Sequence, residues 1–317
     1  MFQKILEKFL SWKTVVFLIR LSKRIVIPGF DGIPLYDVTG FFIKGLSKGY
    51  ITSRASAISF NFFLAVFPTV IFFFTIIPFI PIDNFQQSLL EIIRDFLPDE
   101  AYATVQTTVE DIIIRPHGGL LSIGFILSLY FSTNGINSLM IAFNNTFHTI
   151  ETRPLIKRRI ASIFLVVIIT FLLISAIGSI TLGTWLLSIL LPEQIVRSHF
   201  FFSIILVTKW LITLAMLFFA ISFIYYFVPA KRRHFRFISA GSSLATILVI
   251  ATTLGFNFYV DNFSKYNALY GSIGTLLIIL LWIYFNSFSL LIGFELNASI
   301  YNIKKGRENE EAKSMTS

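Results

Sequence analysis

The sequence predicts an all-α, polytopic membrane protein with six transmembrane helices, and two observations carry that prediction. Six stretches contain no Lys, Arg, Asp or Glu, namely residues 55–82, 118–150, 160–192, 210–230, 237–260 and 266–294. About 20 apolar residues cross the roughly 30 Å hydrocarbon layer as a helix, so each stretch is long enough to span a bilayer. In addition, 55% of the residues are hydrophobic, 14% are charged and the mean hydropathy is +0.78. Soluble domains of this length are more highly charged and less hydrophobic.

The charges between these stretches predict the topology. Residues 1–54 hold nine Lys/Arg against three Asp/Glu, and residues 231–236 hold four against none, whereas residues 83–117 hold two against seven. Lys and Arg stay on the cytoplasmic side during insertion. Both termini and the basic loops 151–159 and 231–236 are therefore expected inside, and the acidic segment outside. No cleavable signal peptide is evident, so the first span is expected to act as an uncleaved anchor.

The first 54 residues are predicted to form amphipathic helices in the headgroup region before the first span. Apolar residues recur there at helical spacing beside lysines, in two groups: Phe2, Ile5, Leu6 and Phe9, then Leu35, Val38, Phe42 and Leu46. Such helices lie at the membrane surface with their bases toward anionic lipid. The chain has no cysteine, which excludes disulfides and thiolate-bound metal clusters.

The elements that follow are six spans, one external segment and a tail. The spans are expected at residues 57–81, 119–143, 160–191, 204–228, 237–260 and 272–303, with a charged cytoplasmic tail at 304–317. Pro68 and Pro78 interrupt the first span, and each is expected to kink the helix, either to line a binding site or to serve packing. Residues 83–117 repeat the helical spacing and predict an external helical cap, the alternative being a plain connecting loop.

Polar residues in the second, fifth and sixth spans lie on single helical faces. In hydrocarbon such faces turn inward, because an unsatisfied polar group there is costly. They either let helices pack closely or line a polar pathway. Asn144, Asn286 and Asn297 are the candidate pathway residues among them.

One carboxylate in the last span, Glu295, indicates a candidate functional site. Glu295 follows 23 residues after Ser272, which at about 1.5 Å per residue places it near the cytoplasmic edge of the membrane. A carboxylate there seeks a cationic partner or a wet cavity. Arg54, at the start of the first span, is the preferred partner, with Arg153 and Lys231 as alternatives. The pair is either a structural lock or a gating or coupling site.

Several segments occur together in a recognisable order along the chain. They are Arg54-Ala-Ser-Ala-Ile-Ser-Phe with Phe67-Pro68, Phe143-Asn144-Asn145 with Arg153-Pro154, Tyr266-Asn-Ala-Leu-Tyr-Gly-Ser272, and Gly293-Phe-Glu295-Leu-Asn297-Ala. In this combination the chain resembles the YihY/BrkB family, over about residues 40–303. The resemblance implies a six-span protein of the bacterial inner membrane. It also brings the historical label ribonuclease BN, a link to serum resistance, and the suggestion that members move lipids or other solutes.

The residues themselves argue against a ribonuclease. Metal-dependent RNA cleavage needs His and Asp/Glu clustered around ions near the phosphate, whereas the four histidines, His117, His148, His199 and His234, stand in different loops. The basic loops are accounted for by topology, so no nucleic-acid partner is expected. No P-loop, nucleophile elbow or metal-ligand spacing is present, and neither a cofactor nor catalytic residues are predicted.

The function predicted from the sequence is transport. Kinked helices, inward polar faces and a cationic inner rim favour a transporter or translocase of an amphiphilic or anionic, lipid-like substrate, with membrane lipids as partners. Its expected pathway or gating residues are Arg54, Glu295, Asn144, Asn286 and Asn297. A lipid-modifying enzyme or a membrane scaffold is the alternative.

Overall fold

The structure, a computed structural model, is built from helices. It describes residues 17, 20–48, 50–80, 86, 87, 111, 114–144, 154–190, 199–229, 237–262 and 272–316. The elements are α3 (Leu35–Lys48), α4 (Ile51–Ile76), the 3₁₀ turn η1 (Ile77–Phe79), α7 (Gly118–Asn144), α8 (Leu155–Leu190), α10 (His199–Phe227), α11 (Ala240–Asn262) and α13 (Ser272–Thr316). No strand occurs within these described ranges, so the predicted all-α class is confirmed.

Six helices are long and apolar enough to cross a membrane, in agreement with the prediction. The candidate spans are Ile51–Phe79, Gly118–Asn144, Leu155–Ala176, Ser203–Phe227, Ala240–Val260 and Leu276–Ser314. The last helix, α13, runs without a break through the segment that the sequence marks as a charged tail. Its 45 residues make it about 68 Å long at 1.5 Å per residue, roughly twice the hydrocarbon thickness.

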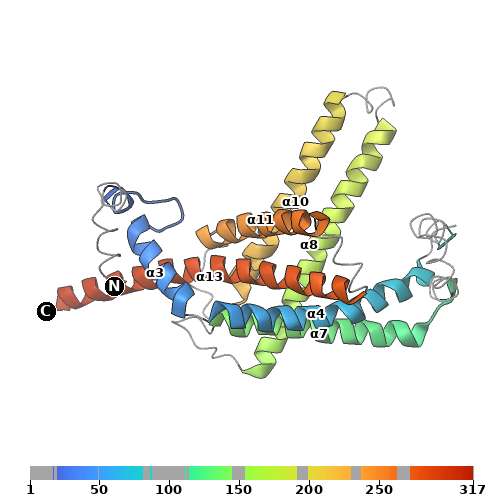
Figure 1. The fold of residues 1–317 in the computed structure, drawn as a ribbon, viewed down its shortest axis with the longest axis horizontal. Helices are drawn as coiled ribbons and strands as arrows, with labels where there is room; N and C mark the ends of the chain where they lie inside the picture. Colours follow the sequence, from blue (N-terminus) through green and yellow to red (C-terminus); the bar gives the residue numbers. More distant parts are fainter. Residues whose placement is uncertain are drawn as a thin grey trace.

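Four spans form two antiparallel pairs that lie side by side. Figure 1 shows α4 along α7 and α11 along α13, with α13 also against α4. The hairpin of α8 and α10 is inclined to these pairs and extends away from them (Figure 1). The spans are therefore arranged as a packed group of four helices and a diverging hairpin.

The buried core lies at one end of the spans. It takes residues from the N-terminal halves of α4, α8 and α11, the C-terminal ends of α7 and α10, and the middle of α13. We refer to it as the inner cluster, with these buried members: Ile51, Ala55, Ile58, Ile136, Leu139, Met140, Ala142, Phe143, Ala161, Leu165, Ile221, Ile224, Tyr225, Val228, Ala245, Leu291 and Phe294. These are the helix ends that the predicted topology assigns to the cytoplasm.

The helix α3 confirms the helical character predicted from Leu35, Val38, Phe42 and Leu46. Its buried Val38 joins Phe30 and Ile33 against Leu296, Ile300 and Ile303 of α13, which forms a second, smaller core. Two ion pairs hold the same contact: Arg307 Nη2 lies 2.9 Å from Asp37 Oδ2, and Lys304 Nζ lies 3.6 Å from Asp31 Oδ2. The amphipathic helix expected around Phe2–Phe9 and most of the external cap 83–117 lie outside the described residues.

The two prolines of the first span occupy different positions. Pro68 lies inside α4, and Figure 1 shows that α4 changes direction over its second half. Pro78 lies at the start of η1, where the α-helix ends and a single 3₁₀ turn follows. Because proline lacks the backbone N–H that an α-helix interior needs, Pro78 marks the end of the regular helix.

Candidate functional site

Three aromatic rings close the centre of the inner cluster. Phe143 of α7 stacks on Phe294 of α13, with ring centroids 4.1 Å apart and planes 11° apart, and Tyr225 of α10 meets both rings edge-on at 5.5 and 5.9 Å. All three side chains are buried. The Tyr225 hydroxyl donates to the backbone oxygen of Leu290 at 2.5 Å, which ties α10 to α13. Offset and edge-on pairs of this kind add to the stabilisation from burial.

Beside the rings, α11 and α13 cross at close range. A Cβ placed on Gly293 would lie 2.6 Å from the Tyr225 hydroxyl and would also overlap the backbone oxygen of Gly241 and the Ala245 side chain. Only glycine permits this approach, because any larger side chain would separate the two helices.

Next to the crossing, Asn297 holds the N-terminus of α11. Its Oδ1 accepts from Gly241 N at 2.8 Å, and its Nδ2 donates to Ser239 Oγ at 2.8 Å. Ser239 and Ser242 complete a reciprocal cap, since Ser242 N donates to Ser239 Oγ and Ser239 N donates to Ser242 Oγ, each at 3.1 Å. The first N–H groups of a helix have no partner within the helix, so these bonds satisfy them. Asn297 thus has a clear structural task, and a pathway role for it stays a prediction.

Replacing Asn297 with alanine is expected to lower the free energy of unfolding by about 1–3 kcal/mol, because it leaves a buried backbone N–H at the start of α11 without its acceptor. The matched control is Asn302→Ala, since Asn302 donates only to Ala298 O of its own helix at 2.8 Å. Denaturant titration in detergent, followed by circular dichroism, measures both. Equal losses in the two variants would contradict the assigned cap.

The predicted partnership between Glu295 and Arg54 is confirmed. Arg54 Nη1 lies 3.8 Å from Glu295 Oε2, and the two side chains are only 9% and 1% exposed. That separation exceeds hydrogen-bond length, so this contact is a Coulombic one. The third element of the site is α3, because a Cβ on Gly45 would overlap Glu295 Oε1. The alternative partners, Arg153 and Lys231, lie outside the described residues.

The other two asparagines are placed apart from each other. Asn144 is buried at the last residue of α7 and donates to Met140 O at 2.7 Å. Asn286 donates to Trp282 O at 2.8 Å, while its Oδ1 is buried and accepts no hydrogen bond. Nine positions separate Asn286 from Glu295, about 13 Å along α13. No described contact links Asn144 to Asn286. Their role in a pathway stays a prediction.

Sequence reasoning missed three contributors to this end of the molecule. Arg159 was accounted for by topology alone, yet its Nη1 donates to Asn134 Oδ1 at 2.6 Å and its guanidinium lies 4.8 Å from the centre of the Tyr130 ring. No sequence pattern indicated a role for Tyr225 or Gly45. Each acts on a residue of another helix, and the local sequence around each carries no signal of that partner.

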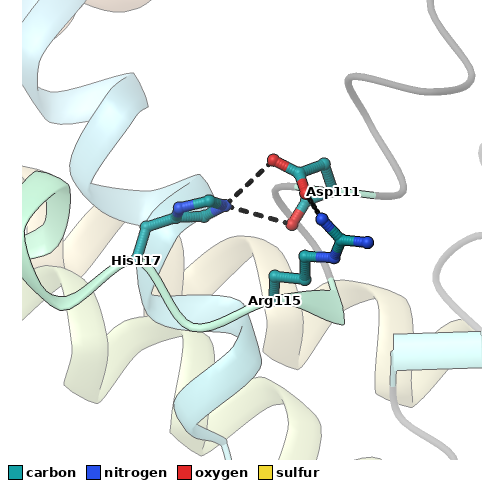
Figure 2. A network of polar contacts seen from close by, with 3 residues as sticks. All are labelled: Asp111, Arg115 and His117. Atoms are coloured by element: carbon teal, nitrogen blue, oxygen red, sulfur yellow. Dashed lines mark hydrogen bonds and ion pairs between the residues drawn. The ribbon is translucent and has the colours of Figure 1, made fainter.

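A polar network lies at the opposite end, before α7. Figure 2 shows Asp111 between Arg115 and His117, with Arg115 Nη1 3.2 Å from Asp111 Oδ1 and His117 Nε2 3.1 Å from Oδ2. His117 therefore has an acidic neighbour, which the sequence did not indicate. Within the described part of the chain there is no group of three or more His, Cys, Asp or Glu that could hold a metal ion. The expectation that the chain is not an enzyme stays a prediction.

Comparisons with known proteins extend over most of the chain. The sequence model of the family described as virulence factor BrkB matches residues 42–316. A ribonuclease-like protein, YfkH of Bacillus subtilis, is 29% identical over 83% of this chain and 96% of its own length. UPF0761 membrane proteins of Alteromonas mediterranea and Aggregatibacter aphrophilus are 27% and 23% identical, over 88% and 83% of this chain and 92% and 91% of their own lengths. No solved structure matches the chain significantly.

Proposed function

Since this chain belongs to the BrkB virulence factor family, with relatives named as membrane proteins, we propose that it translocates an amphiphilic, lipid-like substrate across the bacterial inner membrane. The proposed orientation has both termini in the cytoplasm, on the side of the basic segments. The substrate's path lies along the α8–α10 hairpin, and the Arg54–Glu295 pair is its inner gate.

The observation that carries the proposal is an exposed stretch of α10 in the diverging hairpin. Residues 206–211 of α10 are all exposed, and six consecutive positions cover every side of a helix. In the most apolar window of α10 only 6% of the residues are buried, against 22% in α7. The hairpin contacts the four packed spans through the inner cluster, while its outer half diverges from them (Figure 1). This arrangement suits a path that opens sideways to acyl chains.

The inner cluster, at the other end of the hairpin, supports the same proposal. A substrate moving along the hairpin meets the stacked rings of Phe143, Tyr225 and Phe294, and beside them the Arg54–Glu295 pair. An anionic headgroup can compete with Glu295 for the Arg54 guanidinium, because arginine binds phosphate and carboxylate alike. Exchange of one anion for the other would loosen the contact between α4 and α13 and open the inner end.

Reconstitution into vesicles with a screen of fluorescent phospholipids and labelled solutes tests the function. Transfer of a fluorescent lipid between leaflets, above that in protein-free vesicles, is the expected result. Absence of transfer for every lipid and solute class tested would overturn the proposal. Chemical modification of a lipid during the same assay would instead assign the chain to the enzymes.

A charge swap separates a gate from a structural lock. The double variant Arg54→Glu with Glu295→Arg keeps one buried pair but reverses it, so it is expected to retain much of the stability while losing flux to background. The matched control is Glu308→Gln, on the exposed extension of α13, which should leave flux unchanged. Recovery of both stability and flux in the swap would show that the pair only locks the helices together.

A further inference from the structure

A groove on the outside of α3 forms a second candidate site, away from the inner cluster. Its volume is about 890 Å³, within the range typical of small-molecule sites. Three parts of the chain form it: residues 21–25, one face of α3, and the extension of α13 at Ile303 and Arg307. Its walls are mostly apolar, with Leu21, Ile25, Phe41 and Ile43 among them.

The groove is preformed, because α3 is fixed from its other side. Val38 is buried in the small core against α13, and Arg307 binds Asp37 at 2.9 Å. The apolar walls nevertheless remain open, with Ile43 58% and Phe41 42% exposed. Exposed side chains of this size favour contact with hydrocarbon. The chain enters its first candidate span at Ile51, three residues after α3 ends, so we expect these walls at the membrane surface.

The charges at the rim indicate which lipid fits. Asp37 is the one acid among the described lining residues, and it is bound to Arg307. Lys44 lines the groove, and Lys23 Nζ lies 4.9 Å from the centre of the Tyr36 ring, which also lines it. Arg20 and Arg24 flank the same short segment. The rim is therefore positive above an apolar floor.

We propose that this groove binds an anionic phospholipid, with an acyl chain along Leu21, Ile25, Phe41 and Ile43 and the phosphate-bearing head between Lys23 and Lys44. Each base near a membrane surface favours anionic lipid by roughly fivefold in affinity. The site is separate from the translocation path and does not depend on transport.

Lipid-specific quenching tests the proposal in the full-length protein. The chain has no cysteine, so Thr39→Cys, on the groove lining, takes a single bimane label. The labelled protein is reconstituted into vesicles doped with brominated phosphatidylglycerol or with phosphatidylcholine carrying the same brominated chains. Half-maximal quenching by phosphatidylglycerol is expected at a mole fraction about 25-fold lower than by phosphatidylcholine, because each of the two lysines contributes about fivefold. The control label, Ile174→Cys on an exposed face of α8, should be quenched equally by both lipids.

Two variants locate the effect in the groove. Lys23→Gln with Lys44→Gln should abolish the preference, whereas Lys305→Gln, an exposed lysine outside the groove, should not. Gly40→Phe should reduce quenching by the anionic lipid, since the groove has open space where its Cβ would lie and α3 gains a better helix former. Equal quenching by the two lipids at Thr39→Cys, an unchanged preference in the double lysine variant, or a label shielded from every lipid by a protein segment would each overturn the proposal.

Discussion

Replacing Glu295 with alanine while Arg54 remains is expected to lower the free energy of unfolding by about 3–5 kcal/mol. The reason is that Arg54 is 9% exposed and Glu295 1% exposed, so the guanidinium would keep its charge in a buried site that has lost the Glu295 carboxylate. Arg54→Ala should have a comparable cost. Removing both charges together, as in Arg54→Met with Glu295→Met, should cost much less than the sum of the single changes, because no charge is then left buried.

The molecule supplies its own control for this prediction. Arg307 and Asp37 form a shorter ion pair, 2.9 Å, but their side chains are 48% and 41% exposed. Asp37→Ala is therefore expected to cost no more than about 1 kcal/mol, because water screens an exposed pair. Unfolding in mixed micelles, followed by circular dichroism, compares the two pairs directly. If Glu295→Ala lowers the free energy of unfolding by no more than Asp37→Ala does, burial does not increase the contribution of the Arg54–Glu295 pair to stability.

Gly293→Val is expected to destabilise the protein by about 3 kcal/mol or more, at the upper end of what overpacking costs. The new side chain would overlap the backbone oxygen of Gly241, the hydroxyl of Tyr225 and the Cβ of Ala245. Gly241 O belongs to the backbone and Ala245 Cβ has no rotatable bond before it, and the Tyr225 side chain is fully buried, so the strain is relieved mainly by moving α11 and α10 away from α13. The hydrogen bond from Tyr225 to Leu290 would be lost in the same movement.

The control for this change lies on α11. A Cβ on Gly255 would meet nothing within 4 Å, so Gly255→Ala should leave stability unchanged or raise it by about 0.5–1 kcal/mol through helix propensity. Thermal unfolding in detergent, with near-ultraviolet circular dichroism to report on the buried aromatic rings, measures both variants. A Gly293→Val protein as stable as Gly255→Ala would mean that α11 and α13 do not pack as closely as the structure has them.

Much of the fold was accessible from the sequence because a bilayer imposes simple rules on a chain. A helix that crosses hydrocarbon must be long, apolar and almost free of charge, and these properties are visible residue by residue. The pairing of Glu295 with Arg54 was accessible for the same reason, since a carboxylate at that depth needs a cation at the same depth and few were available. The sequence did not predict that α13 extends beyond residue 303, because a charged segment after the last span is typical of a tail. The partners of Lys304 and Arg307 are Asp31 and Asp37, which lie far away in the chain.

The roles of individual polar residues depended on contacts between helices. Asn297 was predicted as a pathway residue on its position in a polar face, yet its amide serves the N-terminus of α11, 56 residues earlier in the chain. Arg159 was explained by topology, yet it binds Asn134 of the neighbouring span. Helical periodicity states which side of a helix a residue is on. It does not state which neighbour will meet that side.

By itself, the sequence determined that this chain is a six-span helical membrane protein, because hydrophobic length acts locally on each segment; that its basic segments share the cytoplasmic side stays a prediction. Only the tertiary structure decided that the packed core lies at one end, that α8 and α10 diverge from the other spans, and that Gly45 and Gly293 are points of close approach. These features depend on the shapes of side chains that meet across different helices, and lipid chains are as apolar as the helix faces they compete with. Close packing and specific polar contacts therefore set which helices associate.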